Sequence, residues 1–189
     1  MEIVLETYIK GRGVWMVTIK IIFNSIIIIF SSILGYVFGN IYSKRAKNLL
    51  DLQYCMHVLE SEIINGNSPL PQALENTSIK GRGNIAILFK EIKEDLIDNK
   101  REDIYDSFLL QRDALRNKYA FTNQDIEVFF YLGKILGKTT RNDQEKNIRF
   151  ILTQLNNHYI EAEAEKSKNT KLYRTLGFLV GLGVVIILI

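Results

Sequence analysis

The chain of 189 residues contains little cysteine, histidine or proline: one, two and two residues, respectively. The single cysteine, Cys55, excludes a disulfide within the chain and is consistent with a reducing compartment. The two histidines, His57 and His158, lack a second pair of ligands at metal-site spacing, so we interpret them as exposed or hydrogen-bonded residues of helices. A cysteine close to a histidine is one pattern of a nucleophile. A thiol inside a helix more commonly packs against its neighbours, and we expect that role for Cys55.

The sequence also lacks a pattern that binds nucleotides or performs acid–base catalysis. Residues 133–140 resemble the end of a phosphate-binding loop, but Gly133 and Gly137 enclose three residues where that loop has four, and no strand precedes them. These glycines instead predict the close approach of a neighbouring helix. The acidic residues lie in charge runs, at 90–106 and 161–168, that are typical of solvated helix faces. We therefore expect no enzyme activity, cofactor, metal or small-molecule substrate.

Charged residues are absent from two long stretches near the ends of the chain. Residues 21–41 are a run of 21 uncharged residues, about the length that crosses a hydrocarbon layer of ~30 Å. Residues 175–189 form a second, shorter run, beside which Arg174 can extend to the headgroups. A buried core helix would not be apolar on every side over such lengths, and a cleaved signal peptide has a shorter apolar region. We predict transmembrane helices over 17–41 and 173–189.

Basic residues flank both runs on the sides that face the middle of the chain: Lys44, Arg45, Lys47, Lys166, Lys168, Lys171 and Arg174. The positive-inside rule then places residues 44–172 in the cytoplasm and both termini across the membrane. The net charge of +3 is too small to indicate nucleic-acid binding, and the bilayer's anionic lipids account better for these clusters.

Residues 1–15 disturb this pattern, because Lys10 and Arg12 lie on the opposite side of the first run. We expect this stretch to be an untranslated or disordered extension. Gly11 and Arg12 can be encoded as a purine-rich ribosome-binding sequence shortly before Met16. N-terminal sequencing of the native protein tests this.

The segment 44–172 has the pattern of an all-α domain. Apolar residues recur in alternating steps of three and four in two places, which indicates helical seams. The seams are Leu49, Leu52, Met56, Leu59 and Ile63, and Ile148, Leu152, Leu155, Tyr159 and Ala162. They predict that the first and last helices form an antiparallel stalk.

Four shorter helices are expected between the seams, one beginning near Pro71 and three over 84–97, 101–119 and 125–137. Thr122 and Asp125 have the spacing of a capping box. No segment alternates with the period of a strand. The predicted fold is therefore a membrane protein in which two transmembrane helices flank a cytoplasmic six-helix bundle.

Both prolines lie in the segment Asn65–Pro71, "NGNSPLP", directly after the first seam. Asn65 and Gly66 tolerate the left-handed conformation that often ends a helix, and Pro71 suits the first turn of the next one. One proline would suffice to stop a helix. Two prolines on either side of Leu70 also predict a stiff surface that presents an apolar side chain to a partner, and the sequence leaves both interpretations open.

Three segments resemble the signatures of the stage III sporulation protein AB family of endospore-forming bacteria. They are "LESEIINGNSPLPQAL" (59–74), "FFYLGKILGKTTRNDQEKNI" (129–148) and "KLYRTLGFLVGLGVVIIL" (171–188). The order and spacing match from Met16 to the end, and the proline segment is the most specific part. Thr140 departs from the pattern, since the family often has an aspartate there.

The resemblance implies a non-enzymatic membrane component of the channel between mother cell and forespore, on the mother-cell side. The cytoplasmic domain of this family is similar to that of platform proteins of type II secretion and type IV pilus systems. By that resemblance the partners are a cytoplasmic ATPase, stage III sporulation protein AA, and other membrane proteins of the channel. The residues expected to bind a partner are Glu62, Gly66, Pro69, Leu70, Pro71, Lys134 and Lys138. The alternative is a membrane-tethered helical signalling adaptor or sensor.

Overall fold

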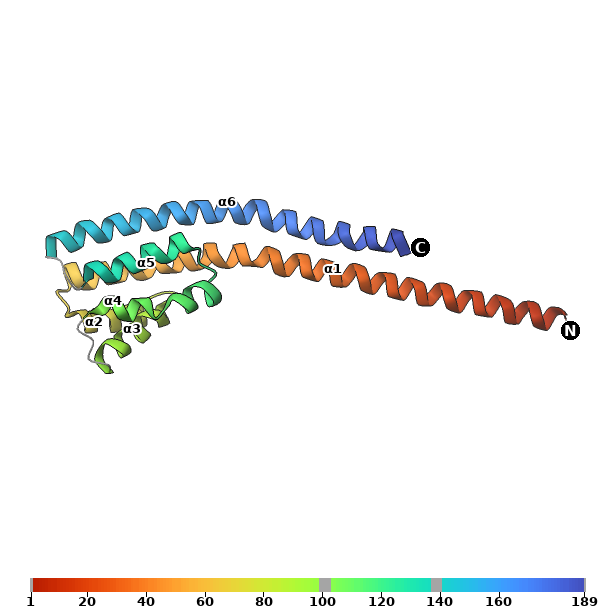
Figure 1. The fold of residues 1–189 in the computed structure, drawn as a ribbon, viewed down its shortest axis with the longest axis horizontal. Coiled ribbons are helices and arrows are strands. Elements are labelled where there is room, and N and C mark those ends of the chain that lie inside the picture. Colours follow the sequence, from red (N-terminus) through yellow and green to blue (C-terminus); the bar gives the residue numbers. More distant parts are fainter. Residues whose placement is uncertain (1, 99–102, 137–140, 189) are drawn as a thin grey trace. The chain divides into compact units, whose positions relative to one another are not determined.

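The computed structural model describes residues 2–98, 103–136 and 141–188, and over these residues it contains helices and no strand. The α-helices are α1 (Glu2–Glu60), α2 (Leu70–Lys80), α3 (Ala86–Asp98), α4 (Ile104–Leu109), α5 (Asn123–Leu136) and α6 (Arg141–Leu188), as Figure 1 shows. Two π-helical turns, Ser61–Asn65 and Ala114–Lys118, lie between them. The predicted all-α fold with six helices is confirmed.

The chain divides into two compact units, to both of which α1 and α6 contribute. Unit 1 comprises Met1–Asn40 and Ser167–Ile189, and unit 2 comprises Ile41–Lys166. In unit 1 the two helices expose long series of large apolar side chains. Each of α1 and α6 contains a stretch that is long and apolar enough to cross a membrane, with 6% of that stretch buried inside the protein. The two long apolar helices expected near the chain ends are therefore present.

Small residues bring α1 and α6 into close contact within unit 1. Gly35 and Gly39 are four residues apart on α1, and Gly177 and Gly181 are four apart on α6. The Cα atoms of Gly35 and Gly177 approach so closely that a Cβ added to Gly35 would lie 2.9 Å from the Gly177 Cα. Ser31 Oγ donates a hydrogen bond to the carbonyl of Gly177. Small residues at four-residue spacing are a common basis of helix packing in membranes.

The core of unit 2 surrounds α5, which is apolar on more than one side because it has neighbours on several. Buried residues of α5 include Ile126, Phe129, Phe130, Leu132, Ile135 and Leu136. The ring of Phe129 meets Phe89 of α3 edge-on, at 6.1 Å between centroids, and Phe108 of α4 at 4.9 Å. A Cβ on Gly133 would lie 2.8 Å from the Phe108 ring, so this glycine permits the approach of α4. The close helix approach predicted at Gly133 is confirmed, whereas Gly137 lies outside the described residues.

The predicted seams of α1 and α6 are buried in unit 2. Leu49, Leu52, Met56 and Leu59 of α1 and Ile148, Leu155 and Ala162 of α6 are at most 1% exposed. Two ion pairs between α1 and α6 show the relative direction of these helices. Glu60 pairs with Arg149 at 3.9 Å, and Arg45 pairs with Glu165 at 2.8 Å. As the residue number falls along α1 it rises along α6, so the pairing is antiparallel, as predicted.

The structure corrects the helix expected over 101–119. Helix α4 ends at Leu109, and a turn separates it from the π-helical turn Ala114–Lys118. This break lets Leu115, Tyr119 and Phe121 all enter the core, and the Tyr119 hydroxyl donates to the carbonyl of Asn84 at 2.9 Å.

The end of α1 is a second correction. Gly66 has right-handed torsions (φ −77°), and Asn67 (φ 51°) occupies the left-handed region.

Candidate functional site: the proline loop and a buried polar cluster

The segment Gly66–Pro71, here called the proline loop, begins where α1 widens into the π-helical turn Ser61–Asn65. The Gly66 amide donates to the Ser61 carbonyl at 2.9 Å, and the Ser68 amide donates to the Glu62 carbonyl at 3.0 Å. A Cβ on Gly66 would lie 2.9 Å from that Glu62 carbonyl, which explains a glycine at a right-handed position. These bonds fold the loop back on the helix, so the loop is an ordered extension of α1.

The carboxylate of Glu62 ties the proline loop to α2. It accepts hydrogen bonds from Ser68 Oγ at 3.1 Å, Asn76 Nδ2 at 2.7 Å and Lys80 Nζ at 2.7 Å. The bond from Lys80 and then that from Asn76 lower the pKa of Glu62 to about 2. Within its own domain Glu62 therefore holds the loop against α2. Its binding of a partner stays a prediction.

Leu70 is the first residue of α2 and is half-buried against the core, while Pro69 and Pro71 on either side are exposed. Pro69 has extended torsions (φ −56°, ψ 147°) and caps the helix, and Pro71 lies in its first turn, as predicted. Leu70 lines a cavity of about 160 Å³ together with Ile63, Ser68, Leu136 and Gln144. The proline loop therefore meets the end of α5 and the beginning of α6 around one cavity, whose wall is part polar and part apolar.

The other two predicted partner-binding residues come from the segment around α5. Lys134 is exposed and holds its ammonium group 5.2 Å from the centre of the Tyr105 ring on α4. Lys138 lies outside the described residues. Of the expected set, the structure thus joins Gly66, Leu70 and the two prolines in one surface and gives Lys134 a neighbour on another helix.

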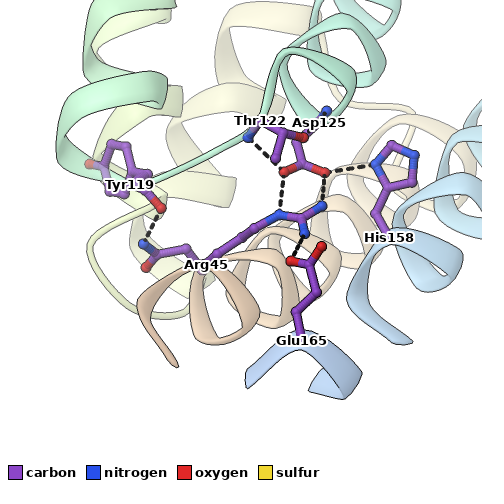
Figure 2. Close-up of polar contacts among 7 residues, drawn as sticks. Arg45, Tyr119, Thr122, Asp125, His158 and Glu165 are labelled. Carbon is purple, nitrogen blue, oxygen red and sulfur yellow. Dashed lines mark hydrogen bonds and ion pairs between the residues drawn. The ribbon is translucent and has the colours of Figure 1, made fainter. Parts of the chain in front are cut away.

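A polar cluster centred on a buried ion pair joins α1, α5 and α6 elsewhere in unit 2 (Figure 2). Arg45 and Asp125 are buried, His158 is partly buried, and Thr122 and Glu165 are exposed. The Arg45 guanidinium binds both oxygens of Asp125, at 2.8 and 3.0 Å, and donates to Glu165 at 2.8 Å. His158 Nδ1 lies 2.8 Å from Asp125 Oδ1. The Thr122 amide donates to Asp125 Oδ2 at 2.9 Å, and the Asp125 amide donates to Thr122 Oγ1 at 3.3 Å, which confirms the capping box.

The cluster keeps a charge inside the domain. Asp125 is fully buried, and this burial raises the pKa of its carboxyl, but the hydrogen bonds from Arg45 and Thr122 outweigh burial and leave that pKa below its usual value. The bond to Asp125 in turn raises the pKa of Arg45 against the effect of burial. A buried ion pair that is fully hydrogen-bonded fixes the relative positions of its elements. Here it holds the three helices in one register.

Residues 20–189 match the family described as stage III sporulation protein AB. The chain belongs to that family. The stage III sporulation protein AB of Bacillus subtilis (strain 168) is 25% identical over 170 residues, which are 90% of this chain and 99% of that protein. A solved structure of stage III sporulation protein AB superposes with a TM-score of 0.58 at 23% identity, over 65% of this chain and 96% of its own, and supports the fold.

Membership of the stage III sporulation protein AB family supports a role in the sporulation apparatus and partners from the same system. The three segments that carried the resemblance, 59–74, 129–148 and 171–188, lie within the matched residues. Two of them meet in the structure, because Leu70 from the first and Leu136 and Gln144 from the second line the same cavity.

Cys55, His57 and His158, the residues considered for chemistry, are buried, exposed and hydrogen-bonded, respectively. Cys55 is buried, and desolvation raises the pKa of its thiol to about 11, so it is not an activated nucleophile. His57 is exposed beside Glu60, and His158 is hydrogen-bonded to Asp125, as the sequence predicted. Within residues 2–98, 103–136 and 141–188, no three side chains of histidine, cysteine, aspartate or glutamate gather at a metal-binding distance.

Sequence reasoning missed the polar cluster as a unit. It found the capping box of Thr122 and Asp125 and assigned Arg45 to the basic residues beside the first run. The sequence does contain a clue to the cluster. Arg45 precedes Leu49 and Leu52 by one and two helical turns, so it lies on the same helix face as the first seam. A charge in line with a buried seam indicates an internal partner.

Proposed function

We propose that the protein is a non-enzymatic membrane platform that docks a cytoplasmic ATPase of the sporulation apparatus. One observation carries the proposal: α1 and α6 each run without interruption from an apolar stretch of unit 1 into the helical bundle of unit 2. The same two helices thus supply both the membrane anchor and the frame of the docking domain. A domain built in this way is suited to hold a soluble partner at the bilayer.

The charge distribution supports the orientation of the platform. Most of the cations beside the apolar runs lie on the sides that face the middle of the chain, so the positive-inside rule favours a cytoplasmic position for unit 2. The family resemblance implies that this cytoplasm is the mother cell's. Residues beyond each span then lie on the opposite side of the membrane. In this orientation unit 2 is the part accessible to a cytoplasmic ATPase.

The proline loop is the proposed docking surface. Gly66, Pro69 and Pro71 are exposed, and their conformation is fixed by the hydrogen bonds around Glu62. A surface ordered before binding loses little conformational entropy on binding. The neighbouring cavity has an apolar wall from Leu70 and Leu136, and it can receive one apolar side chain of the partner.

The test is binding of the purified ATPase to the detergent-solubilised full chain, with the dissociation constant as the measurement. The double variant Pro69→Ala/Pro71→Ala removes only exposed rings, and we expect it and Leu70→Ser to weaken binding about tenfold or more. Leu110→Ser is the matched control, because Leu110 is 58% exposed at the end of α4. It should leave binding unchanged.

Melting temperature separates docking from folding in this experiment. Leu70 packs against the core, so Leu70→Ser also lowers stability, whereas the proline variant should unfold close to the wild-type temperature. The docking proposal fails if both variants unfold at markedly lower temperature while their folded fraction binds the ATPase with wild-type affinity. The loop would then be a structural turn.

A further inference from the structure

Unit 1 contains cations and no acidic residue in its two apolar stretches. Residues 20–40 and 167–188 include Lys20, Lys168, Lys171 and Arg174 and neither aspartate nor glutamate. The guanidinium carbon of Arg174 lies 4.9 Å from the centre of the Tyr36 ring, and both side chains are exposed. The ring covers one face of the guanidinium and leaves its hydrogen-bond donors available.

The helix crossing assembles four groups around this contact. A Cβ on Gly39 would lie 3.3 Å from the Thr170 Cα, so α1 and α6 are still in close contact at this level, one turn from Gly35. Asn40 follows Tyr36 by one turn of α1, and Lys171 precedes Arg174 by one turn of α6, so both extend the contact toward that level. We call Tyr36, Asn40, Lys171 and Arg174 the headgroup patch, and all four are exposed.

The surroundings of the headgroup patch are apolar. Val37 and Phe38 of α1 and Leu172 and Leu176 of α6 expose about half of their surface beside it. An unpaired cation bordered by apolar surface is costly in a bilayer unless an anion accompanies it. Tyrosine prefers the boundary between hydrocarbon and headgroups. The planar fork of arginine matches the oxygens of a phosphate, to which lysine adds a second charge and asparagine a neutral donor.

We propose that the headgroup patch binds the phosphate of an anionic phospholipid in the cytoplasmic leaflet. Charge complementarity selects the occupant: two cations lie at the end of the apolar run, and residues 20–40 and 167–188 supply no carboxylate. The inference rests on the placement of unit 1 in the bilayer under the proposed function. Binding of the lipid fixes the level at which the two helices enter the membrane.

Native mass spectrometry of the full chain, titrated with phosphatidylglycerol or phosphatidylcholine in detergent, measures the affinity for each lipid. We expect tighter binding of phosphatidylglycerol and a loss of about tenfold or more in the variant Lys171→Gln/Arg174→Gln. Arg174→Lys keeps the charge but not the fork, so it should show a partial loss. Tyr36→Leu removes the ring and should also weaken binding.

Lys20→Gln is the matched control, because Lys20 is a cation of the same unit at the other end of the first apolar run. It should leave the affinity for phosphatidylglycerol unchanged. Equal losses from Lys20→Gln and Lys171→Gln/Arg174→Gln, or no preference for phosphatidylglycerol in the wild type, would overturn the lipid site. Reconstitution into nanodiscs of either lipid tests the underlying placement separately. A wild-type chain that enters neither kind of nanodisc contradicts the membrane platform itself.

Discussion

Asp125 carries a negative charge inside unit 2 because donors from two other helices and a loop surround its two oxygens. Its partners, Arg45, Thr122 and His158, come from parts of the chain 80, 3 and 33 residues away. The pKa of Asp125 in the folded protein lies below its ordinary value of 3.8. The stability contributed by the charge is therefore complete above that ordinary value and is lost as the pH falls through the folded pKa.

The variant Asp125→Asn should lower the free energy of unfolding by up to about 3–5 kcal/mol at pH 7, because it leaves the buried guanidinium of Arg45 with the half-exposed Glu165 as its remaining charged partner. Urea unfolding of the full chain in detergent, followed by circular dichroism, measures this. As the pH is lowered below about 5, the variant should also lose less stability than the wild type, because it has no carboxylate at position 125 to be protonated. Identical pH dependence in the two proteins would show that the carboxylate is not charged in the fold.

Adding Arg45→Met to Asp125→Asn provides the control for this interpretation. If the penalty arises from an unpaired buried guanidinium, the double variant should be more stable than the sum of the single losses predicts. Additive losses would mean that the two side chains act independently.

At the scale of single residues, the sequence predicts local contacts better than distant ones. The capping box of Thr122 and Asp125 is visible because its residues are three apart and its geometry is that of any helix start. The pairing of Asp125 with Arg45 depends on tertiary packing, which spacing along the chain does not record. The crowding at Gly66 is a local contact, because the Glu62 carbonyl four residues earlier leaves no room for a Cβ there.

The close packing of α1 against α6 in unit 1 depends on glycine residues. A Cβ on Gly35 would lie 2.5 Å from the Tyr173 carbonyl oxygen and 2.9 Å from the Gly177 Cα, and both obstacles are backbone atoms. The helices would have to separate to accept any side chain there. In contrast, a Cβ on Gly183 would meet nothing within 4 Å.

Gly35→Leu should therefore destabilise the helix pair by about 1–3 kcal/mol, the usual range for overpacking. Gly183→Leu adds the same side chain to open space and serves as the control, with an expected change near zero. Unfolding of the full chain in mixed micelles of increasing sodium dodecyl sulfate fraction compares the two. Similar stabilities for both variants would argue against the observed crossing.

The two seams were predictable because a helix that is buried on one side repeats its apolar residues with the helical period. The break after α4 was not, since residues 101–119 keep a helical period across it. Packing of Tyr119 and Phe121 into the core overrides that local preference. The glycine pairs of α1 and α6 were present in the sequence, but which helices they join depends on the fold.

For the whole molecule, the proposed orientation makes a prediction about access from outside the cell. With Cys55 replaced by serine, a cysteine at the exposed position Asn67 should be protected from an impermeant thiol reagent in intact cells and labelled after permeabilisation. Ile187→Cys, in the last turn of α6, should be labelled in intact cells because it lies at the far end of the proposed span 173–189, at the opposite face of the membrane. Mass shifts of the isolated protein measure the labelling. The reverse pattern would place unit 2 outside the cytoplasm and remove the ATPase proposal.

The bond between Arg45 and Glu165 joins residues 120 positions apart. At a synthesis rate of roughly 5–20 residues per second, the ribosome makes Glu165 roughly 6–24 s after Arg45. The first apolar stretch can therefore enter the membrane well before the seam of α1 has its partner. During that interval the apolar seam residues and Arg45 are open to chaperones, and the bundle closes only when its final helix leaves the ribosome. Closure of unit 2 is thus timed by translation of the last segment of the chain.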